Sequence, residues 1–112
     1  MPSTMTYQAG EIVLVSFPFT MGQRAKKRPG LVVLDSGDAD VLIARITTQI
    51  HTLQWDVLLT HWQSANLLQQ SVIRLHKMAT LEKSSIIARL GSLDPQDHKQ
   101  VGDVLRMMMA SW

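Results

Sequence analysis

Two apolar runs separated by a basic segment, within residues 10–34, constrain the fold most strongly. The runs, residues 12–17 and 31–34, are rich in Val, Ile, Leu and Phe, which suit a buried pleated surface. A loop is expected from Pro18 to Pro29, because proline cannot donate a ladder hydrogen bond. Four positive charges lie in this loop, at Arg24, Lys26, Lys27 and Arg28. The pattern predicts two core strands that hold one cationic loop.

The composition is that of a single globular domain spanning residues 1–112. Apolar residues make up 46% of the chain and charged residues 18%, which excludes a disordered protein. The chain has no run of 18 apolar residues and no signal-peptide pattern, so neither a membrane span nor secretion is expected. The absence of cysteine excludes disulfides and thiolate chemistry and fits the cytoplasm. The net charge of +2 weakly favours an anionic partner.

Four further short strands are expected, and a bend is expected at residues 78–83. The strands span residues 41–49, 55–60, 71–77 and 85–90. The leader, residues 1–9, is expected to be loose, and Asp35, Asp38 and Asp40 to be turn residues. Six strands and a terminal helix predict a mainly β fold, a small and partly open barrel against which the helix packs.

The expected helix begins after Asp94, a good N-cap, with Pro95 at its first position and Asp97 adding negative charge to its first turn. An apolar stripe follows at helical spacing, made of Val101, Val104, Leu105, Met108 and Met109. The consecutive methionines are interpreted as core filling.

Strand alternation brings two sets of polar side chains together. On residues 41–49, alternation predicts a core face formed by Leu42, Ala44, Ile46 and Thr48. It places Arg45 and Thr47 on the opposite face. On residues 71–77, Arg74 and His76 share one face. Each pair combines a cation with a group that can donate or transfer a proton.

The candidate chemical groups are therefore cations, a hydroxyl and an imidazole: Arg28, Arg45, Thr47, Arg74 and His76. Arginine stabilises phosphate charge, and histidine suits proton transfer near neutral pH. Such a set matches cleavage of a phosphodiester by its own 2′-hydroxyl, which needs a base, an acid and a charge clamp but no metal. A basic face that binds RNA or an acidic protein without cleaving is equally compatible. Metal-ligand spacings and nucleotide-binding motifs are absent from the sequence.

Five ordered segments resemble the PemK/MazF family of toxin endoribonucleases. They correspond to a first strand and turn, an Arg-Pro strand entry, a threonine-rich strand end, a fifth strand with the bend after it, and a closing strand with a C-terminal helix. The segments read GEIVLVSFPFT, KKRPGLVVL, ARITTQ, SVIRLHKMATLEKS and LGSLDPQDHKQVGDVLRMM. The resemblance covers nearly the whole chain.

This resemblance implies an SH3-like barrel that forms a homodimer and cleaves single-stranded RNA at short sequences without metal or another cofactor. It also implies a cognate antitoxin that blocks the RNA groove, and contact with DNA only indirectly, through that antitoxin. Carried over by motif, Arg28, Thr47 and Arg74 are catalytic residues. His76 stands where some members have an aspartate and is assigned its proton-transfer role, while Ala79 replaces a common arginine. The expected RNA contacts are Arg24, Lys26, Lys27, Arg45, Thr48 and Gln49.

Two other function classes stay open on sequence grounds. The main alternative is a non-catalytic SH3-like barrel that binds RNA or a partner protein. A regulatory DNA-binding subunit is less favoured, because no recognition helix is expected.

Overall fold

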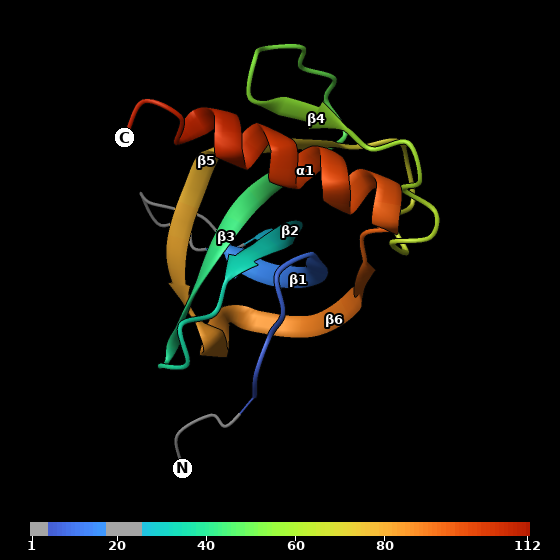
Figure 1. The fold of residues 1–112 in the computed structure, drawn as a ribbon. Coiled ribbons are helices and arrows are strands. Elements are labelled where there is room, and N and C mark those ends of the chain that lie inside the picture. Colours follow the sequence, from blue (N-terminus) through green and yellow to red (C-terminus); the bar gives the residue numbers. More distant parts are fainter. Residues whose placement is uncertain (1–4, 18–25) are drawn as a thin grey trace.

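The computed structural model of the chain describes residues 5–17 and 26–112, and a single sheet organises them. Its strands pair antiparallel throughout, in the order β4-β5-β3-β2-β1-β6. The strands are β1 (Glu11–Phe17), β2 (Lys26–Leu34), β3 (Asp40–Thr47), β4 (Asp56–Leu58), β5 (Val72–Glu82) and β6 (Ile86–Ser92). No pairing joins the two end strands within these residues, so the curved sheet stays open (Figure 1). The predicted mainly β, partly open barrel with a C-terminal helix is confirmed.

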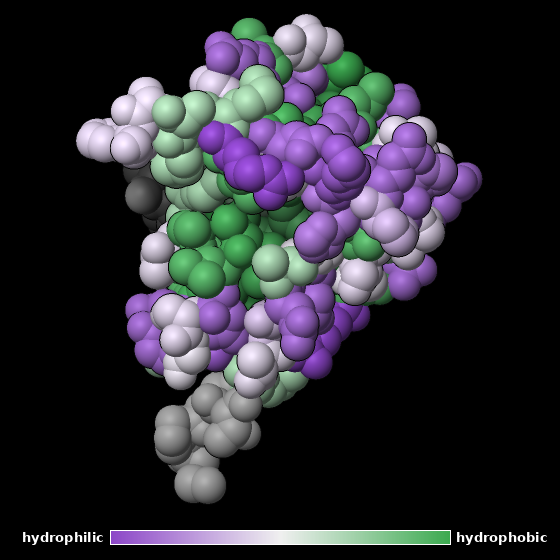
Figure 2. Space-filling model, in the orientation of Figure 1, coloured by the Kyte–Doolittle hydropathy of each residue, from purple (hydrophilic) through white to green (hydrophobic). Residues whose placement is uncertain are grey.

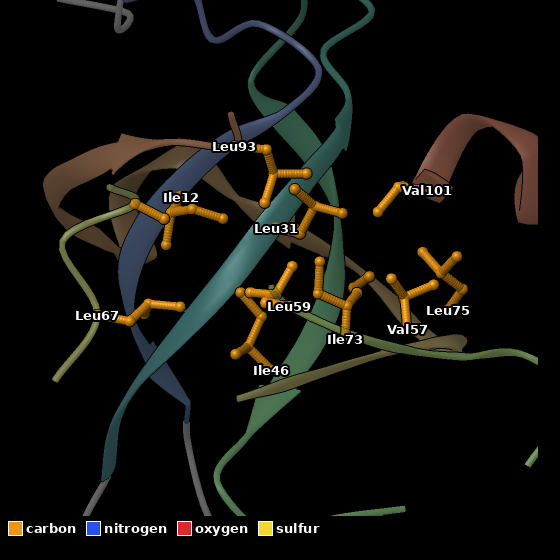
Figure 3. Packing of buried hydrophobic residues seen from close by; sticks show 12 residues of the cluster. Ile12, Leu31, Ile46, Val57, Leu59, Leu67, Ile73, Leu75, Leu93 and Val101 are labelled. Atoms are coloured by element: carbon orange, nitrogen blue, oxygen red, sulfur yellow. The ribbon is translucent and has the colours of Figure 1, made fainter. Parts of the chain in front are cut away.

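Strand β1 is buried on both faces, as its composition predicts. Ile12 belongs to a large core cluster with Leu31 and Ile46, which lies between the sheet and the helix (Figure 3). Val13 and Val15 belong to a second cluster, on the other side of the sheet. Successive side chains of a strand point to opposite faces, so an apolar run without alternation supplies both clusters.

Helix α1 (Pro95–Met108) begins as predicted and lies across one face of the sheet (Figure 1). The Asp94 carboxylate accepts a hydrogen bond from the Asp97 N–H at 2.9 Å, which caps the helix. Val101 is buried, and the other stripe residues up to Met108 pack against the large cluster. Met107 and Met109 were wrongly placed in the core: they are 55% and 59% exposed. The helix ends at Met108, so helical periodicity no longer applies to Met109.

Asp97 ties the start of α1 to the segment that follows β4. Its side chain is buried, and its two oxygens accept hydrogen bonds from the backbone N–H groups of Thr60 (3.1 Å) and His61 (2.8 Å). The sequence predicted only a charge in the first helical turn, because the acceptor role depends on residues 36 and 37 positions away. Asp97 thus fixes the helix by satisfying backbone donors of another segment.

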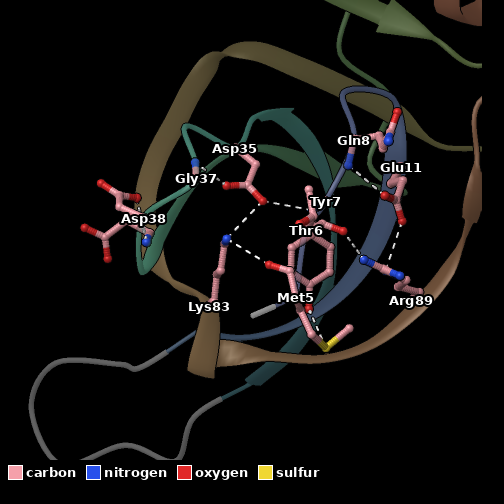
Figure 4. Close-up of polar contacts among 11 residues, drawn as sticks. Met5, Thr6, Tyr7, Gln8, Glu11, Asp35, Gly37, Asp38, Lys83 and Arg89 are labelled. Carbon is pink, nitrogen blue, oxygen red and sulfur yellow. Dashed lines mark hydrogen bonds and ion pairs between the residues drawn. The ribbon is translucent and has the colours of Figure 1, made fainter. Parts of the chain in front are cut away.

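The N-terminal residues from Met5 onward are packed, contrary to the expected loose leader (Figure 4). Tyr7 is buried in the second cluster, and its backbone N–H donates to Asp35. The buried Lys83 ammonium pairs with Asp35 at 3.0 Å and donates to the Met5 carbonyl oxygen. Asp35 therefore joins three distant segments, whereas the sequence predicted only a turn residue.

Several strand boundaries differ from the sequence-based prediction. Strand β2 begins at Lys26, so Lys26–Pro29 belong to a strand rather than to the loop. Strand β5 runs through the expected bend to Glu82, because Met78–Glu82 pair with β3. A short 3₁₀ helix, η1 (Lys83–Ser85), follows it. Strand β3 ends at Thr47, β4 is shorter than expected, and β6 extends to Ser92.

The core face predicted for β3 is also only partly right. Ala44 and Ile46 belong to the large cluster, as expected. Val41 and Ile43, assigned to the opposite face, are buried in the second cluster, and Thr48 is exposed beyond the strand. The reason is that β3 is a central strand with a core cluster on each side.

None of the helices in the described part of the chain is long and apolar enough to cross a membrane.

Candidate nucleic-acid interface

A groove of about 840 Å³ opens where β2 and β3 stop pairing. Their ladder ends at Gly30 and Arg45, whereas β2 continues back to Lys26 paired with β1. Pro29 lies next to this end of the ladder, and its nitrogen carries no hydrogen to donate to a neighbouring strand. The divergence leaves β3 accessible between β2 on one side and β5 on the other, in agreement with the strand order.

The groove is cationic. Among the described residues that line it, five are Lys or Arg and none is Asp or Glu. The cations are Lys26, Lys27, Arg28, Arg45 and Lys77, all exposed. Within the described parts of the chain, no ion pair is formed by Lys27, Arg28, Arg45 or Lys77, so the charge of these four side chains is available to a ligand. Phe17, Pro29, Ile43, Ile46, Met78 and Ala79 add apolar surface to the lining.

Thr47 lies at the end of β3 and lines the groove, with a defined hydrogen-bonding role. Its Oγ1 accepts a hydrogen bond from the backbone N–H of Gln49 at 3.1 Å. A hydroxyl has one donor hydrogen, and this contact leaves that hydrogen unused. The Thr47 hydroxyl is therefore arranged to donate to an acceptor in the groove, such as a phosphate oxygen.

A three-residue irregularity in β5 forms the far side of the groove. Ala44 pairs with Met78 and the next β3 residue, Arg45, pairs with Arg74, so residues 75–77 have no partner on β3. Such a bulge re-aims side chains and breaks strand alternation. As a result Lys77, Met78 and Ala79 line the groove, whereas His76 is not among the lining residues.

Arg74 is held by a carboxylate that the sequence reasoning missed. Its Nε lies 2.9 Å from Oδ1 of Asp56, with side-chain exposures of 11% and 1%. Burial opposes ionisation of Asp56, but hydrogen bonds from Arg74 and from the Leu53 N–H outweigh it and lower the pKa of the carboxyl. Arg45, Arg74 and Asp56 are direct cross-strand partners, so they form one row across β3, β5 and β4. Arg74 lies next to Arg45, on the side of β3 away from β2, and does not line the groove.

His76 occupies the bulge, near Asp56. Its half-buried ring has a buried Nδ1 with no hydrogen-bond partner in the described part of the protein. His76 lies two residues after Arg74 on β5, and Arg74 is the cross-strand partner of Asp56. The imidazole therefore retains an unused polar atom beside that pair.

The structure thus brings together most of the residues that the sequence singled out. Arg28 and Thr47 line the groove, as do the expected contacts Lys26, Lys27, Arg45, Thr48 and Gln49. Arg24 lies outside the described residues. Lys77 and Asp56 were missed, because one depends on a bulge and the other on strand pairing. Over residues 5–17 and 26–112, no three His, Asp or Glu side chains gather as metal ligands would.

Comparison with known proteins identifies similar proteins over the whole fold. A family model described as a PemK-like, MazF-like toxin of type II toxin–antitoxin systems matches residues 8–109. No curated protein matches the chain significantly.

Three solved structures illustrate the similarity of fold. An endoribonuclease in complex with its cognate antitoxin, from a mycobacterial species, has a TM-score of 0.75 at 18% identity, covering 94% of this chain and 96% of that one. MazF from Deinococcus radiodurans has a TM-score of 0.71 at 17% identity over 95% and 98%. The MazE–MazF structure from the same organism has a TM-score of 0.75 at 16% identity over 93% and 96%.

Proposed function

This chain belongs to the PemK-like, MazF-like family of toxins of type II toxin–antitoxin systems, and from that premise we propose that it is an endoribonuclease that cleaves single-stranded RNA. The observation that carries the proposal is the groove itself, with five cationic lining residues and no carboxylate among the described ones. A polyanion gains from such a surface through phosphate contacts. Similarity to structures named endoribonucleases supports the assignment.

The reaction that fits these residues is attack by the ribose 2′-oxygen on the adjacent phosphorus. The bond from phosphorus to the 5′-oxygen breaks, and the departing 5′-oxygen takes up a proton from water, which leaves a 2′,3′-cyclic phosphate and a 5′-hydroxyl. Arg28 stabilises the charge that develops on the phosphate, and Thr47 donates its hydroxyl hydrogen to a phosphate oxygen. Charge stabilisation by these side chains makes the step independent of metal.

His76 takes the proton from the 2′-hydroxyl in this scheme, since it directly precedes the groove-lining Lys77 and imidazole is the side chain best suited to proton transfer. His76 is not itself among the residues that line the groove, so this scheme requires RNA binding to bring the 2′-hydroxyl and the imidazole together. Arg74 acts as a positioning residue for Arg45. It is paired with Asp56 and is the cross-strand neighbour of Arg45.

The proposed partners follow from the same family assignment. A cognate antitoxin covers the groove, and DNA is contacted only through that antitoxin. Residues 1–112 act as one toxin domain in the cytoplasm, where its RNA target resides. We also infer a homodimer. An apolar area beside α1, visible in Figure 2, and the 56% exposure of Leu34 on β2 support association with a second copy.

Incubation of the purified protein with single-stranded RNA in the presence of EDTA tests the activity. Cleavage is expected to persist in EDTA and to leave 2′,3′-cyclic phosphate ends. Replacing the single ribose at the cut site by deoxyribose is expected to abolish the cut, and cleavage of that substrate would refute the mechanism.

The non-catalytic barrel is the second candidate, and two observations on the expected catalytic residues favour it. Arg74 is neutralised by Asp56, and neither it nor His76 lines the groove. Under this alternative the protein binds RNA in the same groove but leaves every RNA intact in the assay above.

A further inference from the structure

We propose that Lys77 forms a second phosphate subsite in the groove, separate from the one at Arg28 and Thr47, which holds a phosphate that flanks the scissile one. The inference rests on the proposed function and deepens it. It assigns the bulge of β5 a role in substrate binding, because the bulge is what turns Lys77 into the groove.

Lys77 lies on the β5 side of the groove. Strand β3 lies between β5 and β2 in the sheet, so Lys77 and Arg28 approach the groove from opposite sides. Neighbouring strands are about 4.8 Å apart, which separates the backbones of β5 and β2 by roughly 10 Å. RNA that lies along β3 therefore has Arg28 on one side and Lys77 on the other.

Lys77 and Thr47 also lie at different levels along β3. Lys77 is adjacent to Met78, which pairs with Ala44, whereas Thr47 lies three residues further along β3. At about 3.3 Å per residue, this offset is roughly 10 Å. A phosphate held by Thr47 is thus at a different level from one held by Lys77, so the two sites take different phosphates of one strand.

The Lys77 ammonium is available to an anionic ligand. Lys77 is exposed and forms no ion pair with the residues described here. By contrast Lys83, six residues later, is buried and neutralised by Asp35. Lysine binds phosphate as a mobile point charge without fixed geometry. Lys77 therefore contributes to affinity and to placement of the strand, and leaves charge stabilisation at the reacting phosphate to Arg28.

Binding of a non-cleavable RNA separates this inference from the activity. The probe carries the cleaved sequence with one deoxyribose at the cut site, and each flanking phosphate in turn is replaced by an uncharged methylphosphonate. For the unmodified probe, Lys77→Ala is expected to weaken binding and to reduce the slope of log affinity against log salt by about 0.7. One methylphosphonate position should weaken binding by the wild type but have no further effect on Lys77→Ala.

Lys99→Ala is the matched control, because Lys99 is an exposed lysine on α1 that pairs with Asp103 away from the groove. It is expected to keep the wild-type salt slope. If every methylphosphonate weakens Lys77→Ala as much as the wild type, Lys77 does not form the subsite, although the proposed function stands. If the wild type neither cuts nor binds RNA, both proposals fail.

Discussion

Arg28 and Lys26 lie two positions apart on β2 and both line the groove, yet we expect their side chains to differ in function. Side chains two apart on a strand share a face, so the two are matched in position. Arg28→Ala should lower kcat by about 100-fold or more, the effect of losing one donor to a charged transition state. Lys26→Ala should mainly raise KM and reduce its salt dependence. Single-turnover and steady-state kinetics distinguish the two, and equal effects would make Arg28 an ordinary phosphate contact.

His76 is tested by the pH dependence of the same reaction. A base accepts a proton only when deprotonated, so the cleavage rate should rise with pH and then level off. His76→Ala should remove this rise, whereas His76→Asp should retain some activity with the rise moved toward acid, since a carboxylate ionises at lower pH. Full turnover and an unchanged pH profile in His76→Ala would leave Arg28 and Thr47 as the only catalytic groups.

At the scale of elements, the close approach of β2 and β3 depends on Gly30. A Cβ at this position would lie 2.5 Å from Cγ2 of the buried Ile43. Gly30→Ala is therefore expected to lower the free energy of unfolding by about 1–3 kcal/mol, the usual effect of overpacking a core. Leucine lacks the methyl branch at Cβ, so Ile43→Leu should recover part of this loss in the double variant. A denaturant series on the four proteins measures the coupling, and additive effects would show that the two side chains do not meet.

At the scale of the whole molecule, Asp35 joins the N-terminal segment, the β2–β3 turn and η1, which follows β5. Hydrogen bonds from the backbone N–H groups of Tyr7 and Gly37, and then from Lys83, lower the pKa of Asp35 to about 2. A lowered folded-state pKa stabilises the protein above the unfolded value of about 3.9, and this contribution is lost as the pH falls toward about 2. Asp35→Asn should destabilise the protein at neutral pH and flatten its loss of stability between about pH 4 and pH 2.

Asp38→Asn is the control for that measurement, because Asp38 lies in the same turn and, among residues 5–17 and 26–112, accepts only a local hydrogen bond from the Asp40 N–H. Denaturant unfolding across this pH range should show the wild-type acid dependence for Asp38→Asn. Identical acid curves for wild type and Asp35→Asn would show that Asp35 is not responsible for the pH dependence.

The homodimer is also a property of the whole molecule. A chain of 12.6 kDa buries a small core and leaves Leu34 exposed at the end of β2, opposite Leu42 of β3. Sedimentation at micromolar concentration should give a mass of about 25 kDa, twice the chain. Leu34→Lys should shift the mass toward the monomer if this apolar surface lies in the interface. A wild-type protein that sediments as a monomer would contradict the homodimer.

What the sequence by itself determined is local. The apolar run of β1 predicts burial on both faces, Asp94 and Pro95 mark the start of α1, and the clustered cations next to Pro29 mark the groove. These features depend on neighbours along the chain, and backbone geometry links such neighbours directly. The residues Arg28 and Thr47 were found in the same way, from motifs carried on adjacent strands.

Tertiary structure alone decided which distant groups meet. Alternation placed His76 with Arg74 but could not reveal the bulge that turns Lys77 into the groove, because a bulge is defined by what the partner strand leaves unpaired. Asp56 looked like an ordinary strand residue and Asp35 like a turn residue, and only strand pairing and packing brought them to Arg74 and Lys83. The physical reason is that an ion pair between residues 18 or 48 positions apart depends on the path of the whole chain, which local preferences do not encode.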